Sequence, residues 1–435
     1  MEIIPRTIDP SQKRSPKDFT RNRKLPFPRL LVFVLSLVAS GKSRGVDVKS
    51  SEFFRNAKRS GLWPDAEPIH RSALTKARKK VGWNSFQEML EKAVHLAYEC
   101  WPVSPKYVWH GMSVYAVDGS MYELPATDEI RKEFDPKSGL QYKGKGHYPQ
   151  CLVSTLYDVF RRLPIARTVV PVNSCEREQA KQLLPHVPPG SVLLFDRGYP
   201  SFELIGYLIA EFAGHFIFRC PAQQTFPAVE RFIRSRKEEG IIWVDPSDKF
   251  LRKIPVNERK KKKAIKLRII RLVSPDGTIS VLLTNLFNKA LFPRHEIINL
   301  YFRRWEVESY YRDEKIVLDV ETFHGKSCNS IRQELLASAI MSVISRTLTE
   351  LSRVTFDNDF AEPQFKNAIM TLASEAAALA PTDPERALEI FNGILKDISR
   401  VKYYRPRRPR PPQPRVTKRS PGKWATSKQR KLIHA

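Results

Sequence analysis

The sequence predicts a mixed α/β fold, in which a set of strands comes first and helices then alternate with further strands. Short runs rich in β-branched and aromatic residues predict the strands. Helix-like stretches at 175–184 and 202–212 stand on either side of the fourth strand. Strands followed by such alternation indicate a mixed sheet covered by helices. The predicted strands of this sheet are 114–117, 151–157, 165–171, 192–195 and 215–219.

The part of the chain before this sheet is predicted to be helical and basic. Helix-like stretches at 50–59 and 70–81 are separated by a Gly-Leu-Trp-Pro break. The most apolar run, 30–39, has about half the length of a membrane span and follows a Pro-Phe-Pro turn. We therefore expect it to be a buried helix and not a membrane anchor.

The region after the fifth strand breaks the alternation. Turn residues and two strand-like runs at 266–273 and 280–283 predict an inserted β-rich subdomain. Helices are expected at 293–315 and 330–351, and twice more between 362 and 399. The predicted division is therefore a helical domain (1–110), a sheet domain in two parts (111–220 and 285–350), a β-rich insertion (221–284), C-terminal helices (351–401) and a basic tail (402–435).

The charge of the chain predicts a polyanionic partner. Lys and Arg number 74 against 46 Asp and Glu, a formal net charge of +28. Nucleic acid is favoured over an anionic membrane surface as that partner. The five cysteines are odd in number and far apart, which argues against disulfides and thiolate zinc sites. We expect a protein of a reducing cytoplasm in which oxygen atoms hold any catalytic metal.

Two basic segments are candidates for contact with DNA. The helix expected at 70–81 can direct its cations to a groove or its phosphates, although an ordinary amphipathic surface helix explains the pattern equally well. The tail 402–435 has no acidic residue and interleaves Arg with Pro. It is expected to lie along DNA phosphates, and a solvated tail is the alternative. The candidate contacts in the helix are Arg71, Lys76, Arg78 and Lys79.

Two aspartates directly follow predicted core strands. Asp118 is expected to end the strand 114–117, and Asp196 to end the strand 192–195. Asp118 alone is a weak signal, because Asp-Gly is a common turn pair. Two aspartates at neighbouring strand ends are nevertheless typical of a Mg²⁺ site, since this ion prefers carboxylate oxygens, water and phosphate.

A third element has four polar residues on one predicted helix face. Tyr301, Arg304, Glu308 and Lys315 have offsets of 0, 3, 7 and 14. At about 100° per residue they fall within roughly 60° of one another. A surface ion pair between Arg304 and Glu308 is the simpler interpretation. It leaves the tyrosine and the lysine unexplained.

The spacing Tyr-x2-Arg-x3-Glu-x6-Lys is similar to the signature of DDE transposases of the insertion-sequence-four group. Other segments also resemble that family, in the same order, over roughly residues 17–330, including a β-rich insertion. These segments are Val117-Asp118-Gly119-Ser120, Asp196-Arg197-Gly198-Tyr199, Thr284-Asn285-Leu286 and the N-terminal run 19–27.

The resemblance implies a ribonuclease H-like sheet in which Asp118, Asp196 and Glu308 bind two Mg²⁺ ions, with Mn²⁺ expected to substitute. Tyr301, Arg304 and Lys315 are then implied to hold a DNA end. The implied partner is double-stranded DNA, as element ends and target, bound by a homodimer in a synaptic complex in the bacterial nucleoid. A nuclease that cleaves without joining, and a DNA-binding repressor without catalysis, are the alternatives.

Overall fold

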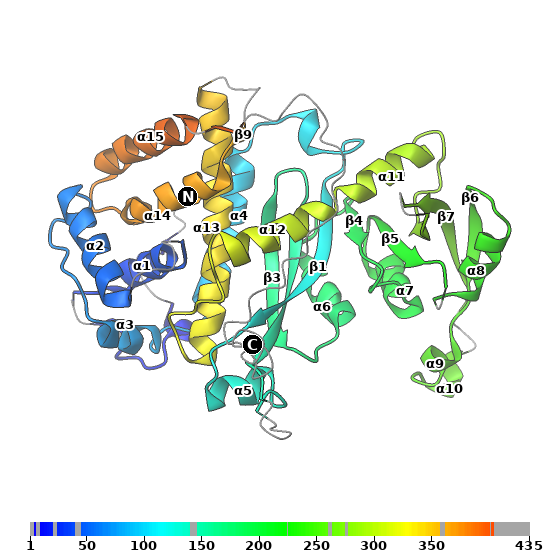
Figure 1. Ribbon diagram of the computed structural model, residues 1–435, viewed down its shortest axis with the longest axis horizontal. Helices are drawn as coiled ribbons and strands as arrows, with labels where there is room; N and C mark the ends of the chain where they lie inside the picture. Colours follow the sequence, from blue (N-terminus) through cyan, green and yellow to red (C-terminus); the bar gives the residue numbers. More distant parts are fainter. Residues whose placement is uncertain are drawn as a thin grey trace, which may run out of the picture.

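An eight-stranded mixed sheet forms the centre of the computed structural model (Figure 1). Its strand order is β3-β2-β1-β4-β5-β8-β7-β6. The structure describes residues 4–5, 9–20, 24–39, 45–139, 146–223, 225–259, 263–274, 277–356, 362–400 and 402–403. Almost all of the predicted tail, 402–435, therefore lies outside the described residues.

The sheet combines antiparallel and parallel pairing, which confirms the predicted mixed α/β class. Strands β1, β2 and β3 form an antiparallel meander, and β4 and β5 run parallel to β1. The other three strands are antiparallel to their neighbours. The strands are β1 (Val114–Glu123), β2 (Gln150–Asp158), β3 (Leu163–Pro171), β4 (Val192–Phe195), β5 (His215–Pro221), β6 (Glu239–Val244), β7 (Ile265–Val273) and β8 (Ile279–Thr284).

The predicted β-rich insertion forms strands, but these strands extend the central sheet. Strand β8 pairs with β5, with Thr284 opposite Ile217, and β7 and β6 follow outward. Three short helices accompany them. The β-rich insertion that the sequence predicts is therefore continuous with the central sheet through backbone hydrogen bonds. The helices between β1 and α13 are α5 (Asp128–Phe134), α6 (Glu176–Leu183), α7 (Phe202–Glu211), α8 (Pro227–Arg234), α9 (Asp248–Leu251), α10 (Val256–Arg259), α11 (Arg294–Phe302) and α12 (Trp305–Ile316).

The two ends of the chain form one helical layer around the long helix α13 (Figure 1). Helix α13 begins at a capping box, in which the Ser327 and Ser330 side chains each accept from the other's backbone N–H. The apolar run 30–39 is buried within α1, as expected, and its Ser36 hydroxyl donates to the Ala373 carbonyl of α14. Among the described residues, no helix is long and apolar enough to cross a membrane. The helices of this layer are α1 (Phe27–Ala39), α2 (Val46–Arg59), α3 (Arg71–Arg78), α4 (Asn84–Cys100), α13 (Cys328–Thr355), α14 (Phe365–Ser374) and α15 (Pro384–Arg400).

A pair of two-residue strands lies near the end of the described chain. Strand β9 (Glu362–Pro363) pairs antiparallel with β10 (Lys402–Tyr403). This pairing brings the residues just after α15 back beside the start of α14.

The side chain of Arg78 does not lie on the surface where its sequence pattern placed it. It is 4% exposed, and its guanidinium donates to Glu334 Oε1 at 2.6 Å, to Gln333 Oε1 at 2.9 Å and to the Ser330 carbonyl at 2.8 Å. These partners all belong to α13. Arg78 therefore fixes α3 to the central helix and cannot reach a DNA groove, because burial between two helices removes it from the surface.

We expect Arg78→Met to lower the free energy of unfolding by about 3–5 kcal/mol, because the Glu334 carboxylate would stay buried without its cation. Lys79→Met, which changes the exposed neighbour in the same way, should change it by less than about 0.5 kcal/mol. Chemical denaturation of both variants measures the difference. Equal stabilities would show that the buried pair does not hold α3 in place.

Candidate active site

Strand β1 does not end at Asp118, contrary to the prediction. It continues to Glu123 because it pairs with β2 over its whole length, with Asp118 opposite Thr155. The parallel neighbour β4 does end there, since its last residue Phe195 lies opposite Val117. Asp118 within β1 and Asp196 directly after β4 thus lie at the point where β4 stops, which is where polar groups of an α/β sheet are accessible to a ligand.

The pleat directs both aspartates to one face of the sheet. Side chains alternate between faces along a strand. Val114 and Ala116 of β1, and Val192 and Leu194 of β4, belong to the core cluster that also contains buried residues of α11 and α12. Asp118 continues the alternation in β1, and Asp196 continues it after β4. Both carboxylates therefore face the helices that carry the predicted signature.

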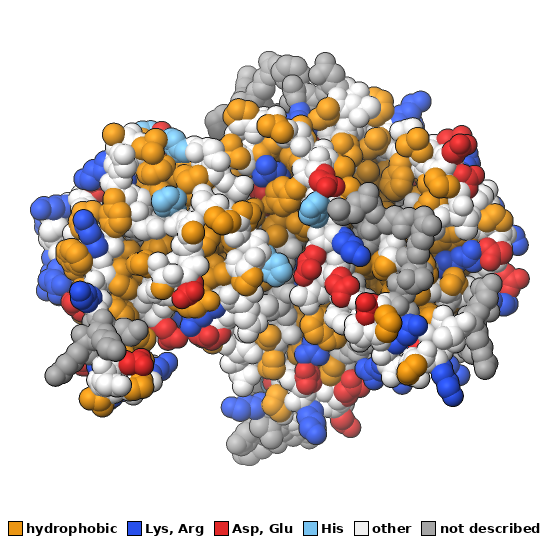
Figure 2. All heavy atoms as spheres, turned by 180° about the vertical axis from the view of Figure 1, so that it is seen from behind, with side chains coloured by type: hydrophobic (Ala, Val, Ile, Leu, Met, Phe, Trp, Pro, Cys, Tyr) orange, Lys and Arg blue, Asp and Glu red, His pale blue; other side chains and the backbone are white. Residues whose placement is uncertain are grey.

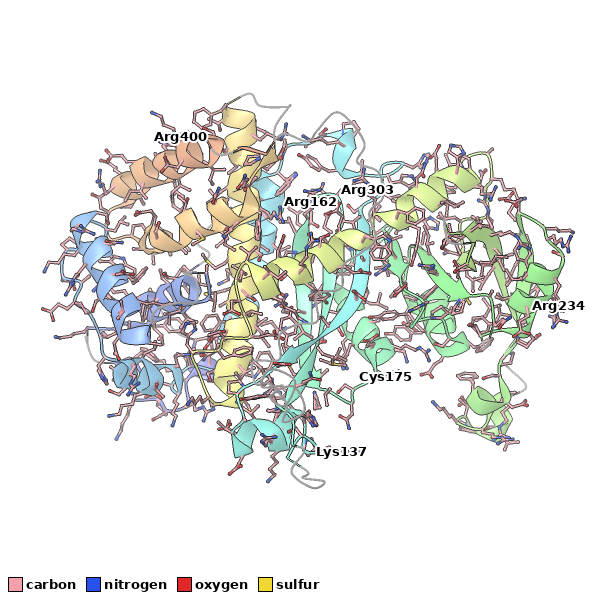
Figure 3. The ribbon with its side chains drawn as sticks, viewed as in Figure 1. Lys137, Arg162, Cys175, Arg234, Arg303 and Arg400 are labelled. Atoms are coloured by element: carbon pink, nitrogen blue, oxygen red, sulfur yellow. The ribbon has the colours of Figure 1, made fainter. Side chains whose placement is uncertain are left out.

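The predicted helix at 293–315 is two helices. Helix α11 ends at Phe302, and α12 begins at Trp305. Arg303, labelled in Figure 3, lies in the turn between them. The backbone N–H groups of Arg303 and Arg304 donate to carbonyls three residues earlier, as in a tight turn. Tyr301 is consequently on α11, whereas Glu308 is on α12.

Despite this break, Tyr301 and Arg304 both approach Asp196, and Arg304 also contacts Glu308. Arg304 donates through Nη2 to Glu308 Oε1 at 2.6 Å, and the same atom lies 3.8 Å from Asp196 Oδ1. The Tyr301 hydroxyl is 3.4 Å from Asp196 Oδ1. Arg304 is only 2% exposed, so it is not the surface ion pair that the simpler interpretation required.

Arg304 retains hydrogen-bonding capacity inside the site. Its Nε and Nη1 atoms are buried and have no hydrogen-bond partner among the described residues. Buried guanidinium donors are costly to leave unpaired. Arginine presents its donors in a planar fork that matches the oxygens of a phosphate. The chemistry of this side chain therefore suits an anionic ligand that enters beside the carboxylates.

Lys315 contacts the strand that carries the first aspartate. Its Nζ donates to Ser120 Oγ at 2.9 Å and to the Met121 carbonyl at 2.6 Å. The same atom lies 4.6 Å from the centre of the Tyr122 ring. The last turn of α12 is thus attached to β1 within a few residues of Asp118.

The site brings negative charges near one another, with Asp118 the most removed from water. Removal from water raises the pKa of Asp118, Arg304 lowers it, and the like charges of Asp196 and Glu308 raise it, with a result of about 7. An Asp carboxyl ordinarily has a pKa near 3.9. A nearby cation would relieve this repulsion.

Glu176 is a further carboxylate near Asp196 that the sequence did not indicate. It is the first residue of α6, directly after Cys175, which Figure 3 labels. A Cβ placed on Gly119 would lie 2.9 Å from its Oε1 atom. Burial raises the pKa of Glu176, and Asp196 raises it further. A single glutamate at the start of a helix has no pattern that relates it to a distant strand, so its place became visible only in the fold.

The donor chemistry of the site fits a divalent cation, but the spacing of its ligands does not. Three carboxylates supply the hard oxygen atoms that Mg²⁺ prefers. Among the described residues, however, no three His, Cys, Asp or Glu side chains lie close enough together to hold a metal ion. The guanidinium of Arg304 bridges two of the carboxylates in this arrangement.

Comparison with known proteins identifies the family. Residues 109–344 match the family described as the transposase DDE domain, and this segment is more than half of the chain. The chain belongs to the DDE transposases. Its predicted relation to the insertion-sequence-four group is confirmed by likeness to the transposase InsG for insertion sequence element IS4 of Escherichia coli K12.

The relatives of this DDE transposase differ in how much of it they match. InsG is 23% identical over 365 residues, which cover 82% of this chain and 78% of that protein. The putative transposase InsZ of the same strain is 26% identical over 142 residues, or 32% of this chain and 45% of that protein. Among solved structures, the piggyBac transposase synaptic complex with hairpin DNA has a TM-score of 0.44 at 10% identity, covering 84% of this chain and 75% of that one.

We expect Asp118→Asn to stabilise this transposase at high pH when no divalent metal is present. The folded-state pKa is raised above the unfolded value, so stability is present at low pH and is lost as the pH rises from about 4 through 7. The variant should therefore match the native protein near pH 4 and melt at a higher temperature at pH 8.

Thermal melts in a chelator, at both pH values, measure the effect. Added Mg²⁺ should then raise the melting temperature of the native protein at pH 8 more than that of Asp118→Asn. A melting difference that does not depend on pH would show that Asp118 is not destabilised by its charge.

Proposed function

We propose that this transposase binds the terminal inverted repeats of an insertion sequence and catalyses Mg²⁺-dependent strand cleavage and strand transfer. The observation that carries the proposal is that Arg304 contacts both Asp196 and Glu308, while the charges of all three residues shift the pKa of Asp118 on the neighbouring strand β1. The order β3-β2-β1-β4-β5, with its antiparallel meander and parallel pair, supports a ribonuclease H-like catalytic domain.

The three carboxylates are the proposed metal ligands, together binding two Mg²⁺ ions, with Mn²⁺ as a substitute. When bound, such ions activate the attacking oxygen and stabilise the leaving 3′ oxygen of an in-line displacement at phosphorus. The chain supplies the orientation of these ligands. Asp118 is fixed within a paired strand, while Glu308 is held by a helix that is itself attached to that strand.

The cations of the site are proposed to hold the DNA end. The unpartnered Nε and Nη1 atoms of Arg304 can donate to a phosphate beside the carboxylates. Tyr301 can position the same strand through its hydroxyl group, which lies near Asp196. Lys315 adds a positive charge along β1. These groups would place the scissile phosphate before the displacement begins.

Other surfaces are proposed to contact the DNA outside the active site. Arg71, Lys76 and Lys79 of the helical domain are exposed, which supports a role in binding the element ends. Seen from behind, Lys and Arg side chains also gather along the edge formed by α8 and β6 (Figure 2). Two copies of the chain are proposed to hold the two ends together. The exposed cations at that edge are Arg231, Arg234, Arg236 and Lys237.

We expect Asp118→Ala, Asp196→Ala and Glu308→Ala each to lower the cleavage rate by at least a thousandfold, since each removes a metal ligand. Binding of a DNA fragment that spans the gene and its flanks should remain within about threefold, because carboxylates do not attract phosphate. Cleavage assays and gel shifts on the same preparations give both numbers. If the native protein cleaves DNA but does not join the cleaved end to a target, it is a nuclease. If any one variant keeps the native cleavage rate, the substituted residue does not belong to the site.

We expect Arg304→Ala and Lys315→Ala to slow cleavage while the fold stays intact, because both remove a positive charge that positions phosphate. Lowering the salt concentration should partly restore the rate of Lys315→Ala, since weaker screening strengthens the remaining phosphate contacts. It should not restore Glu308→Ala. Cleavage rates over a salt series, with thermal melts as a control for folding, test this. Native rates in both cation variants would contradict a DNA-holding role for this helix face.

A further inference from the structure

A charged residue occupies the buried stripe of the catalytic helix α12. The residues of this helix that face the sheet are Val307, Tyr310, Tyr311 and Glu314, all buried. Their spacing of 0, 3, 4 and 7 is that of the apolar side of an amphipathic helix. Glu314 stands at the fourth place, where such a helix ordinarily has an apolar side chain, and it is completely buried.

Four hydrogen bonds satisfy the Glu314 carboxylate. Oε1 accepts from Arg167 Nη1 at 3.1 Å and from Ser338 Oγ at 2.7 Å. Oε2 accepts from Arg167 Nη2 at 3.1 Å and from the Tyr122 hydroxyl at 2.5 Å. Arg167 is thus paired in a two-pronged fork, the arrangement with the strongest directional preference.

The same guanidinium also holds the elements on either side. Arg167 donates to the Leu335 carbonyl at 2.6 Å and to the Tyr310 hydroxyl. The network therefore joins four elements that are distant in sequence: Tyr122 is on β1, Arg167 on β3, Glu314 on α12 and Ser338 on α13.

A buried ion pair is weak evidence for stability, because its removal from water offsets most of its attraction. Apolar side chains of similar volume would hold α12 against the sheet equally well. They would, however, permit the helix to slide or rotate, since apolar contacts have little directional preference. The fork between Arg167 and Glu314 instead specifies one axial position and one rotation of the helix.

This position matters to the active site because the network lies one to two turns from Glu308. Between them, the Tyr311 hydroxyl donates to the carbonyl of Asp118 itself at 2.7 Å. A slip of α12 by one residue would move Glu308 by about 1.5 Å along the helix and by about 100° around it. Such a displacement would take its carboxylate away from the two aspartates.

We propose that the buried network of Arg167, Glu314, Tyr122 and Ser338 is a positioning device, which sets the register of α12 on β1 and so places Glu308 opposite Asp118 and Asp196. These four are positioning residues and do not touch DNA or metal. The predicted effect of this network on the cleavage rate rests on the proposed function. The structural part of the inference, the register of α12, stands independently.

Two serines of α13 provide a matched test. Both are buried, and each hydroxyl lies within hydrogen-bond distance of a carbonyl of its own helix, Ser338 of the Leu335 carbonyl and Ser342 of the Ser338 carbonyl. Only Ser338 also reaches Glu314. Ser338→Ala should speed amide hydrogen exchange in residues 305–316 and slow cleavage about tenfold, because even a misplacement of about 1 Å can slow a reaction about a hundredfold. Ser342→Ala should change neither the exchange nor the cleavage rate. The two variants should have similar melting temperatures.

The hydrogen-exchange measurement uses the full chain without DNA, so it remains decisive even if the native protein cleaves nothing. In that case the proposed function fails, whereas the inference is still judged by exchange in α12. Cleavage is measured on a plasmid that carries the gene with its native flanking DNA. Identical exchange in the two serine variants would overturn the inference.

A second pair of variants separates positioning from stability. Glu314→Gln leaves Arg167 without its counter-charge and should slow cleavage about a hundredfold at unchanged DNA affinity. The double variant Arg167→Met with Glu314→Met replaces the ion pair by apolar groups and should recover the melting temperature. If its cleavage stays slow, the network positions the helix. If cleavage returns with stability, the network is structural only and the proposal is wrong.

Discussion

Repulsion between the carboxylates of Asp118, Asp196 and Glu308 is the constraint to which the surrounding structure responds. Three acidic groups held near one another and partly out of water would separate unless each were attached to a rigid element. Asp118 is held in place because β1 pairs with β2 both before and after it in the sequence. Arg304 lies between Asp196 and Glu308. The buried cation offsets part of this charge, and the family to which the chain belongs depends in general on a divalent metal.

The same constraint explains why the catalytic helix is attached with polar groups. Helix α12 meets β1 through the Tyr311 hydroxyl and the Lys315 ammonium, and it meets β3 and α13 through Glu314. Each of these hydrogen bonds is directional, so together they fix the position of α12 in addition to holding it against the sheet. Precise placement of ligands is worth more to a phosphoryl-transfer enzyme than additional stability.

The helical layer serves the site at a distance. The buried pair of Arg78 and Glu334 joins α3 of the N-terminal region to α13, and α13 in turn contributes Ser338 to the network beneath α12. One long helix therefore contacts both the region with exposed cations and the helix of the third carboxylate. Arg78, which the sequence pattern predicted to contact DNA, thus has a structural role.

Local patterns in the sequence predicted many of the elements and singled out the residues that we propose for the site. Alternating or continuous apolar runs predicted the positions of most strands of the sheet, but β6 was missed and β1 was predicted too short. The spacing of Tyr301, Arg304, Glu308 and Lys315 singled out the signature because helical periodicity is a local property. The buried helix at 30–39 was also evident, since its length and composition exclude a membrane span.

Only the tertiary structure decided how these pieces combine. Pairing with β2 carries β1 past Asp118, and a turn at Arg303 divides the signature helix. The approach of Glu176 to Gly119, and the burial of Arg78, likewise depend on elements far apart in the chain. Each of these features arises from contacts between distant segments, whose register and burial no local pattern specifies.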